Sequence, residues 1–544
     1  MTTPLDNQAI AGRLDAFAAL LELAGSGRYT SRAYRRAAET IRETRAPVEE
    51  LVRAGRVQEL SGIGPGIANR LRELVETGTI AELDELEHEV QPELVGLGRL
   101  LGVSTKRMLE IGRVLGARTA DELRAAAREG RLQEVPGIGP STEKRLLERL
   151  ERERTEPRQG LTLNRARALT EEVAAALAGE VAGDPRRWAD ASFGLAVVVA
   201  SDTPEAVLKE FEALPAIVAV VERESRRAVG VTVEGIPLEL LVPGRERFGT
   251  ELLRATGSRA YVDALGPLPQ AAGETDVFAA LGVPWCPPEL REEPFRGKPP
   301  ALVELDEVRG DLHCHTTWSD GKASVLEMAT AARDFGYEYV AICDHTRDVR
   351  VVPGLDADDL RRQAEEIAAA NEELAPFRVL RGTEVDIRSD GSLDLPDDVL
   401  AELDWVQLSL HAGQREAREP LTRKVTEAMR HPAVSCLSHP FGRIINHRPP
   451  NALDLEAVIE TALETGVALE TNGLPDRLDL PGPEIRRAIE AGVPIVASTD
   501  AHSVRGLGNM RLAIATARRG WATAADIVNT RPLAGLPLRN PRSR

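Results

Sequence analysis

Two histidines and an aspartate stand close together in the stretch DLHCHTTWSDG, residues 311 to 321. Side chains alternate across a β-strand, so a strand here would point His313 and His315 toward the same face. Two imidazoles on one face can share a metal ion, although two ligands do not complete its coordination shell. A solvent-exposed strand end explains the same pattern without any chemistry. This stretch alone leaves both interpretations open.

From about residue 308 the sequence alternates strictly between short apolar runs and amphipathic stretches. The expected strands are 308–313, 338–344, 378–386, 405–411, 433–438, 466–471 and 494–499. The expected helices are 323–335, 356–373, 420–430, 454–465 and 484–491. Seven strands that alternate with helices predict a parallel, barrel-like sheet. In such folds the chemistry lies at the C-terminal ends of the strands.

Side chains that can bind metals follow nearly all of these strand ends. They are His313, His315, Asp320, His345, Glu384, His411, His439, Asp500 and His502. Carboxylates that are buried together without cations repel each other. Mixed imidazole and carboxylate ligands suit manganese, zinc or iron better than calcium. Because nine ligands are too many for one ion, we predict two to three divalent metal ions.

The order HxH, Asp, His, Glu, His, His and DxH resembles the polymerase and histidinol phosphatase (PHP) family over residues 308 to about 530. The resemblance implies a distorted seven-stranded β/α barrel with a trinuclear metal site that hydrolyses phosphate esters. It assigns one metal to His313, His315, Glu384 and Asp500. It makes Glu384 bridge to a second metal held by His411 and His439, and assigns the third to Asp320, His345 and His502.

The resemblance also points to the residues that act on substrate. We expect the catalytic set to be His313, His315, Glu384, Asp500 and His502. Arg443 is a candidate phosphate contact, because a guanidinium binds phosphate in a bidentate way. A salt bridge on the rim of the barrel is an equally good interpretation of Arg443.

The N-terminal region repeats a short turn. LSGIGPGIANRLREL at 60–74 and VPGIGPSTEKRLLERL at 135–150 each place Gly-Ile-Gly-Pro before a helix, and a degraded relative lies at 100–116. Glycines let a backbone pass close to a phosphate, and the following helix offers free N–H groups. Such contacts recognise the DNA backbone and not the base sequence. We therefore predict helix-hairpin-helix elements that bind DNA through Gly62, Gly64, Gly137 and Gly139.

Residues 161–290 predict a small α+β unit with strands at 193–201, 216–223, 228–235 and 237–243. Between the hairpins and the barrel, this unit completes a resemblance to bacterial family X DNA polymerases with a C-terminal PHP domain. The palm of that family has a Gly-Ser turn and two aspartates that bind the catalytic metals. Here Asp184 stands at the serine position, and Gly194 and Ala196 stand at the aspartate positions. Glu239 stands at the position of the third acid.

Two-metal nucleotidyl transfer needs all of these acids, so we predict an inactive polymerase palm. Some relatives also have a lyase that needs a lysine in the helix of the first hairpin. Arg70 occupies that position here. Because its guanidinium stays protonated, it is not a usable nucleophile, and we predict that this lyase is absent.

The length of 544 residues predicts several domains. We expect a helical hairpin region at 1–155, a palm- and thumb-like domain at 161–290, a linker at 287–307 and the PHP barrel at 308–544. The net charge of −18 argues against a protein that coats nucleic acid, but residues 1–160 are nearly neutral. We see no membrane-span segment, no secretion signal and no CxxC pair. The expected location is the cytoplasm.

These features favour a metal-dependent DNA phosphodiesterase, either a 3′–5′ exonuclease or an abasic-site nuclease used in repair. One alternative is a small-molecule phosphatase like the histidinol-phosphate branch of the same barrel, which the acidic barrel permits. The other is a non-catalytic DNA-binding scaffold, against which the intact ligand set argues. DNA contacted along its backbone is the expected partner.

Overall fold

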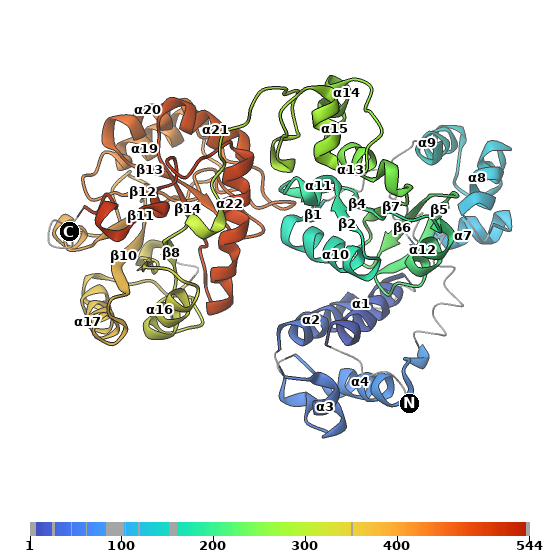
Figure 1. The fold of residues 1–544 in the computed structure, drawn as a ribbon. Helices are drawn as coiled ribbons and strands as arrows, with labels where there is room; N and C mark the ends of the chain where they lie inside the picture. The colour runs from blue at the N-terminus through green and yellow to red at the C-terminus, as the bar shows by residue number, and fades with distance from the viewer. Residues whose placement is uncertain are drawn as a thin grey trace.

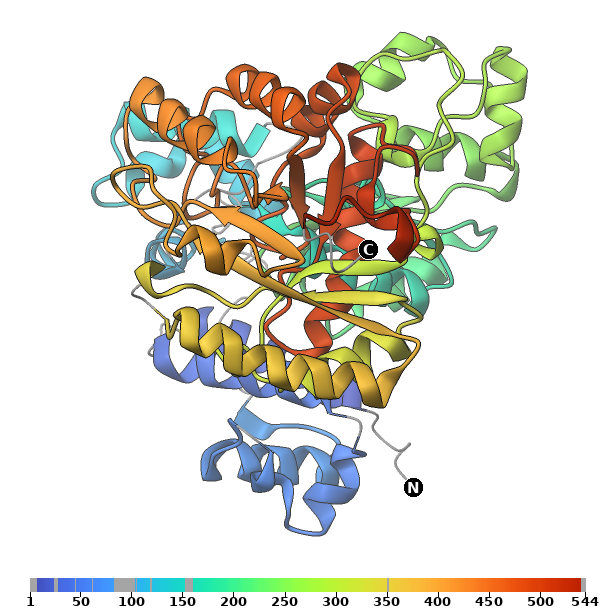
Figure 2. The ribbon, with the colours of Figure 1, turned by 90° about the vertical axis from the view of Figure 1, so that its left-hand side faces the viewer.

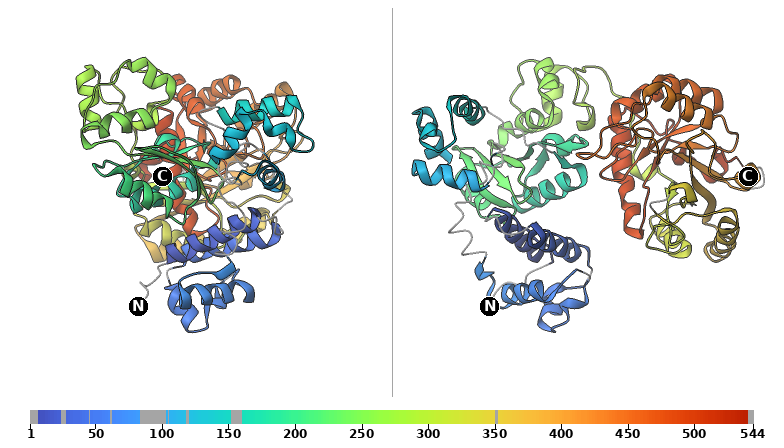
Figure 3. Two further views of the ribbon diagram at one scale, coloured as in Figure 1. Left: turned by 90° about the vertical axis from the view of Figure 1, so that its right-hand side faces the viewer. Right: turned by 180° about the vertical axis from the view of Figure 1, so that it is seen from behind.

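The computed structural model describes residues 7–23, 28–44, 46–60, 62–82, 103, 105–117, 120–151, 160–349 and 352–539. Figure 1 shows three parts in chain order: N-terminal helices in blue to cyan, a central sheet with its helices in green, and a barrel in yellow to red. Figure 3 shows the same arrangement from two further sides. The predicted fold class, with helical hairpins, an α+β palm-like region and a seven-stranded barrel, is confirmed.

Helices make up the described N-terminal residues. They are α1 (Asn7–Leu23), α2 (Arg28–Glu43), α3 (Val48–Arg53), η1 (Val57–Glu59), α4 (Pro65–Thr77), α7 (Thr105–Leu115), α8 (Ala120–Arg128), η2 (Arg131–Glu134) and α9 (Pro140–Glu151). α1 and α2 pack as a pair around Phe17 and Tyr34, whose ring centroids lie 4.9 Å apart. The first hairpin packs onto this pair through Ile63 and Leu71. Of the degraded hairpin relative at 100–116, only a part is described, and most of it forms α7.

The central part is a five-stranded sheet in the order β2-β4-β7-β6-β5. Its strands are β2 (Glu180–Ala182), β4 (Leu195–Val198), β5 (Ile217–Arg223), β6 (Arg227–Thr232) and β7 (Pro237–Leu241), and a small ladder joins β1 (Leu161–Thr162) to β3 (Ala191–Ser192). The helices are α10 (Leu163–Ala176), α11 (Gly183–Arg186) and α12 (Pro204–Glu212). All four predicted strands are present here as β4, β5, β6 and β7.

A helical unit follows the sheet and contains η3 (Arg245–Arg247), α13 (Phe248–Thr256), α14 (Arg259–Leu265), α15 (Glu274–Leu281) and η4 (Pro288–Leu290). At the start of the expected linker, 287–307, the structure differs from the prediction. Arg291 is fully buried and bonds through Nη1 to Glu274 Oε1 at 2.6 Å and through Nε to the Cys286 carbonyl at 2.9 Å. The first residues of the expected linker therefore belong to the packed helical unit, because a buried guanidinium requires fixed partners.

The C-terminal part is a sheet of seven parallel strands in the order β14-β13-β12-β11-β10-β9-β8. They are β8 (Gly310–Cys314), β9 (Tyr339–Ile342), β10 (Arg378–Asp386), β11 (Trp405–Ser409), β12 (Cys436–Leu437), β13 (Ala468–Asn472) and β14 (Ile495–Ser498). An isolated parallel bridge between Cys314 and Ala501 brings the two edges together. Figure 2 faces this nearly closed barrel.

Helices cover the outside of the barrel: α16 (Val325–Asp334), α17 (Ala357–Leu374), α18 (Asp397–Leu400), α19 (Arg418–Met429), α20 (Leu455–Thr465), α21 (Gly482–Ala491) and α22 (Met510–Arg519). Short 3₁₀ turns are η5 (Leu305–Glu307), η6 (Arg347–Val349), η7 (Val504–Asn509), η8 (Val528–Thr530) and η9 (Leu533–Gly535). α16 begins with a capping box in which Ser324 and Glu327 satisfy each other's backbone N–H groups. Every residue of β8, β11 and β13 is buried, as expected for parallel strands covered on both faces.

The palm-like sheet and the barrel meet at a partly buried ion-pair cluster. Asp190 accepts hydrogen bonds from Arg443 at 2.7 Å and from Arg519, both of which belong to the barrel. The Asn446 amide donates to the Gly160 carbonyl at 2.7 Å. Burial opposes the charged form of Asp190, but the two guanidinium groups outweigh it and lower its pKa. The loop after β12 therefore carries groups that fix the barrel against the palm.

Candidate metal centre and nucleic-acid elements

The nine predicted metal ligands converge at the C-terminal ends of the barrel strands. Six are buried, namely His313, His315, His345, Glu384, His439 and Asp500, whereas Asp320, His411 and His502 are partly exposed. The backbone turns sharply where β12 and β14 end, since His439 and Asp500 have positive φ values of 24° and 50°. Such backbone conformations are uncommon and gather at functional sites.

Glu384 lies at the centre of this cluster. Its Oε2 is 2.9 Å from His345 Nδ1 and 3.5 Å from His313 Nε2. Its Oε1 is 2.9 Å from His439 Nε2 and 3.6 Å from His411 Nε2. A carboxylate with imidazoles on both oxygens has the geometry needed to bridge two cations.

Two further groups complete the cluster. His315 Nε2 is 3.0 Å from Asp500 Oδ1 and 3.2 Å from His313 Nε2. Asp320 lies 3.2 Å from His502 Nε2 through Oδ2 and 3.7 Å from His345 Nε2 through Oδ1. The groups of side chains that could share one ion match the implied assignment only in part. His315 groups with Asp320, His345 and His502 as well as with His313 and Asp500, and His345 also groups with Glu384 and His411.

The electrostatics show why cations suit this site. Burial opposes ionisation of Glu384, yet the charges of His345, His411 and His313 hold its pKa well below the ordinary value. Burial likewise opposes ionisation of Asp500, and His313 and His315 outweigh it to keep its pKa well below normal. Buried anions of this kind require positive charge close by.

The donor set also fits bound cations at the level of single atoms. His315 Nδ1 and His439 Nδ1 are buried and have no hydrogen-bond partner in the described part of the chain. His313 and His315 bring their Nε2 atoms within 3.2 Å of each other. Neutral imidazole carries one lone pair on a ring nitrogen, and a metal ion accepts it.

Sequence reasoning missed the carboxylates that hold the ligands in place. Glu470, on β13, accepts from His313 Nδ1 at 2.7 Å and from the His439 backbone N–H at 2.7 Å. Asp386, two residues after Glu384, lies 2.8 Å from His411 Nδ1. The signal for Glu470 was available, because it is an acid near the C-terminal end of a predicted strand, as Glu384 is. Such partners fix the orientation of a metal-binding imidazole and raise its basicity.

Replacing Glu470 with glutamine is expected to weaken metal binding about 10- to 100-fold, as is typical when an outer partner of a metal-binding histidine is lost. The amide keeps the shape but cannot accept from His313 Nδ1 and the His439 N–H with the same charge. Metal titration followed by calorimetry measures the change. Unaltered affinity would show that Glu470 only fills space.

The environment of Arg443 is not the one expected of a phosphate contact, because other groups already occupy its guanidinium. Its Nη2 donates to Asp190 at 2.7 Å and to the Leu478 carbonyl, and its Nε donates to the Arg477 carbonyl at 2.7 Å. These bonds would have to break before the guanidinium could bind a phosphate. The structure gives Arg443 the salt-bridge role, between the barrel and the palm.

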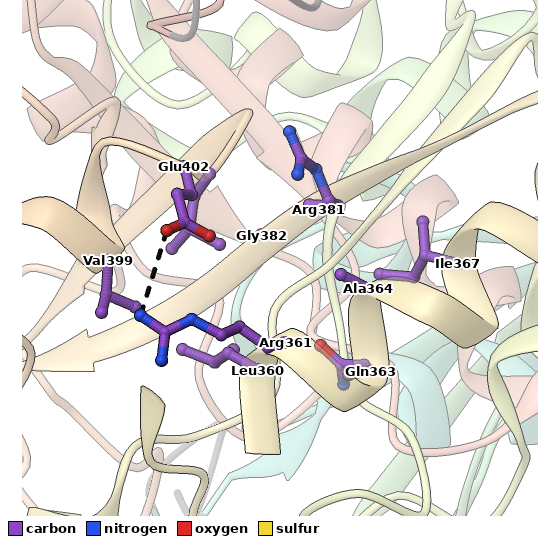
Figure 4. A pocket seen from close by; sticks show the side chains of 10 residues that line it. Leu360, Arg361, Gln363, Ala364, Ile367, Arg381, Gly382, Val399 and Glu402 are labelled. Atoms are coloured by element: carbon purple, nitrogen blue, oxygen red, sulfur yellow. Dashed lines mark ion pairs between the residues drawn. The ribbon is translucent and has the colours of Figure 1, made fainter. Parts of the chain in front are cut away.

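A separate hollow of about 210 Å³ lies on the outside of the barrel, between α17 and β10. Figure 4 shows Arg361 and Glu402 across its mouth and Gln363 and Arg381 along its walls. None of the nine predicted ligands lines it. The chemistry of the barrel therefore has to be placed at the strand ends, where the titratable side chains converge.

The two predicted hairpin turns have matching structures. Gly62 and Gly137 have positive φ values of 82° and 79°. Gly64 and Gly139 precede α4 and α9, and their carbonyls accept the first helical hydrogen bonds, from Ala68 at 2.9 Å and from Glu143 at 2.9 Å. All four glycines are exposed, whereas the isoleucine between each pair is buried. Each turn therefore presents backbone outward at the start of a helix.

The structure separates two kinds of glycine in these turns. Gly62 and Gly137 need a backbone conformation that other residues rarely adopt, so their replacement strains the fold. An added Cβ at Gly64 or Gly139 meets no atom within 4 Å. Only the second pair can carry a side chain that blocks an approaching phosphate without disturbing the turn.

The double variant Gly64→Ala with Gly139→Ala is therefore expected to bind DNA at least about tenfold more weakly, because a hydrogen bond to a charged group contributes about 1.5–3 kcal/mol. Fluorescence anisotropy with labelled duplex measures this. Hydrolysis of a small chromogenic phosphodiester and the melting temperature serve as controls. Parallel losses of DNA binding and of small-ester hydrolysis would mean that the turns only support the fold.

Two of the positions compared with the palm acids lie on neighbouring strands of the central sheet. β4 and β7 run parallel, and Ala196 is paired in register with Glu239. Glu239 accepts from Arg227 Nε at 2.6 Å. Asp184 bonds to Arg187 through its carboxylate. In the described residues, every group of three or more side chains that could hold a metal ion lies in the barrel.

Family models match the N-terminal helical region and the barrel. The model described as a PHP domain matches residues 311–472. A helix-hairpin-helix domain matches residues 5–80, and a SAM-like helix-hairpin-helix tandem matches residues 95–152. Fold, site and models together define a PHP barrel protein with helix-hairpin-helix elements. None of the described helices combines the length and the hydropathy that crossing a membrane requires.

The chain is 32% identical to the DNA polymerase/3′-5′ exonuclease PolX of Bacillus subtilis (strain 168), over 96% of each chain. It belongs to the PolX family, and the predicted resemblance to bacterial family X polymerases with a PHP domain is confirmed. Its barrel is also similar to probable phosphatases. One from Thermoanaerobacter sp. (strain X514) is 27% identical over 40% of this chain and 89% of its own. One from Acetivibrio thermocellus is 31% identical over 35% of this chain and 78% of its own.

Proposed function

We propose that the chain is a metal-dependent DNA phosphodiesterase that acts in repair, as a 3′–5′ exonuclease or an abasic-site nuclease. The observation that carries this proposal is the nine-ligand cluster at the strand ends, in a chain that also presents two exposed hairpin turns. The relationship to an exonuclease over nearly the whole chain supports the same conclusion.

The residues of the centre have distinct tasks in this proposal. His313, His315, Glu384 and Asp500 would hold one divalent ion, and Glu384 with His411 and His439 would hold a second. Asp320, His345 and His502 would hold a third. Divalent cations bound there would make a water molecule more acidic and would stabilise negative charge on the leaving oxygen. Manganese, zinc and iron match these ligands.

Other residues keep the ligands oriented for this chemistry. Ser409 donates to Glu384 Oε1, and Ser438 donates to the same oxygen at 3.3 Å. Asn472 donates to Asp500 Oδ2 at 2.9 Å. Carboxylates that are held by such donors keep their lone pairs aimed into the site, which preorganises it for charge that develops during hydrolysis.

We also propose that the palm supports the DNA and does not synthesise it. Gly194 and Ala196 offer no carboxylates, and Glu239 alone cannot bind two metals. The ion pair of Glu239 with Arg227 supports this interpretation. The N-terminal lyase is proposed to be absent as well, since Arg70 bonds to Glu73 at 3.0 Å and to Glu82.

The test uses purified protein and labelled 3′-recessed, blunt and abasic duplexes, with and without Mn²⁺. Metal content is measured by mass spectrometry on the same preparation. We expect two to three transition-metal ions per chain and metal-dependent release of nucleotides. A protein that binds no metal and stays inactive after metal addition would contradict the proposal.

A small-molecule phosphatase is the second candidate, and the similarity of the barrel to probable phosphatases favours it. The two candidates differ in products. DNA hydrolysis releases nucleotides, whereas a phosphatase releases inorganic phosphate from small esters. Efficient turnover of small phosphomonoesters, with no action on any DNA end, would replace the first candidate by the second.

A further inference from the structure

Three arginines on neighbouring loops lie at one side of the metal centre. Arg415 follows the ligand His411 on the loop after β11. Arg448 lies on the loop after β12, which also carries His439. Arg477 lies on the loop after β13. Because parallel strands end at the same rim of a barrel, these loops share one edge with the ligands.

Hydrogen bonds join the three loops to each other. The Asn451 amide donates to Gln414 Oε1 at 3.2 Å, which joins the first loop to the second. The Ile445 backbone N–H donates to the Asp476 carbonyl at 2.7 Å, which joins the second loop to the third. Arg448 is itself held, since its Nε donates to the Gly442 carbonyl at 2.7 Å. The three loops are therefore joined to each other beside the centre, and the Arg448 side chain is held on its loop.

Two arginines of this group are not paired with a carboxylate among the described residues. Arg415 and Arg448 form no ion pair with a carboxylate in the described part of the chain, where most other arginines of the barrel do. Arg477 Nε approaches Asp500 Oδ2 at 3.8 Å, which places it beside a predicted metal ligand. Burial lowers the pKa of Arg448, and the charges of Arg477 and Arg415 lower it further, against the opposing effect of Asp479. A shared anion would relieve this repulsion.

We propose that Arg415, Arg448 and Arg477 bind successive backbone phosphates of a DNA strand whose terminal phosphodiester lies at the metal centre. Arg477 is next to the reacting phosphate, and Arg448 and Arg415 take the phosphates that follow. This inference rests on the proposed nuclease function and specifies its substrate as a polynucleotide strand. A small phosphate ester is too short to reach the second and third arginine.

The position of these loops supports a continuous DNA path. The loop with Arg448 also carries Arg443 and Asn446, which bond to Asp190 and Gly160 of the palm. Figure 1 shows the barrel and the palm-like sheet side by side at this contact. A strand that leaves the metals past Arg448 thus runs toward the palm. Arginine suits this task, because its guanidinium binds phosphate in a bidentate way.

The test compares the wild type with the double variant Arg415→Ala with Arg448→Ala. Arg477 is kept, because it lies beside Asp500 and its loss could disturb the metals. The substrates are a labelled single-stranded oligonucleotide and the p-nitrophenyl ester of thymidine 5′-monophosphate. We expect the KM for the oligonucleotide to rise at least about tenfold. The selectivity, the ratio of kcat/KM for DNA to kcat/KM for the ester, falls correspondingly.

Salt dependence gives a readout that a merely structural role would not change. Each phosphate contact with a single strand contributes about 0.7 to the slope of log KM against log salt, so the double variant should lower that slope by about 1.4. Arg415→Lys with Arg448→Lys keeps the charges and should restore most of it. Arg423→Ala is the matched control, because Arg423 is exposed on α19 and has no ion pair in the described chain.

The outcomes separate this inference from the proposed function. If the wild type degrades DNA and the double variant keeps both selectivity and salt slope, the arginine inference is wrong and the nuclease function stands. Equal losses on both substrates would also overturn it, since they would indicate damage to the metal centre. If the wild type hydrolyses only the small ester, both the nuclease function and this inference are overturned.

Discussion

Glu384→Gln is expected to abolish hydrolysis, with a loss of about 10³-fold or more in kcat/KM, because removing one electrostatic group typically costs about 10²–10³-fold. In the proposed centre this variant would also lose a metal ligand shared by two ions. Glu384 lies within 4 Å of five imidazoles, which no other carboxylate of the centre does. The amide keeps the shape but carries no charge, so at least one metal ion per chain should be lost. Nucleotide release from labelled DNA and metal content measure both effects.

Two variants make this prediction specific. His313→Ala with His315→Ala should empty at least one metal site and stop hydrolysis in the same way. His431→Ala is the control, because His431 lies outside the cluster and its Nε2 faces Asp397 at 3.5 Å. DNA binding by the hairpins should survive in all three variants. Hydrolysis that continues in Glu384→Gln with full metal content would remove Glu384 from the catalytic set.

No incorporation of deoxynucleotides is expected on primed or gapped DNA, with Mg²⁺ or Mn²⁺, in preparations that degrade DNA. The expected deficit against an active palm is several orders of magnitude, since each lost electrostatic group costs about 10²–10³-fold. Gly194 and Ala196 supply no carboxylates, and Glu239 is the one acidic residue on β4 and β7. Primer extension on denaturing gels measures the activity.

Degradation of the primer could hide weak synthesis, so the assay is repeated in the Glu384→Gln background. Template-dependent extension there that disappears with Glu239→Ala would show that the palm is active. Extension that survives Glu239→Ala would mean that the acids were aligned with the wrong residues. Either result would replace the proposal that the palm only supports DNA.

Local patterns in the sequence were enough to predict several features. The seven strands and their helices follow from alternation of apolar runs and amphipathic stretches, which is a property of neighbouring residues. The hairpin turns follow from Gly-Ile-Gly-Pro, since glycine supplies the positive φ of Gly62 and Gly137. The convergence of the nine histidines and acids could be predicted because strand ends of a parallel barrel meet at one rim.

Tertiary structure decided the features that depend on residues far apart in the chain. Glu470 supports His313 from 157 positions away, and Asp190 pairs with Arg443 from 253 positions away. A sequence pattern does not carry such distances, because they arise only when the strands close and the palm packs on the barrel. For the same reason Arg443 could be predicted equally well as a phosphate contact or a salt bridge. The structure decides between them, because Asp190 of the palm lies beside Arg443. The clustering of histidines and acids at the strand ends, in contrast, could be predicted from their order in the sequence.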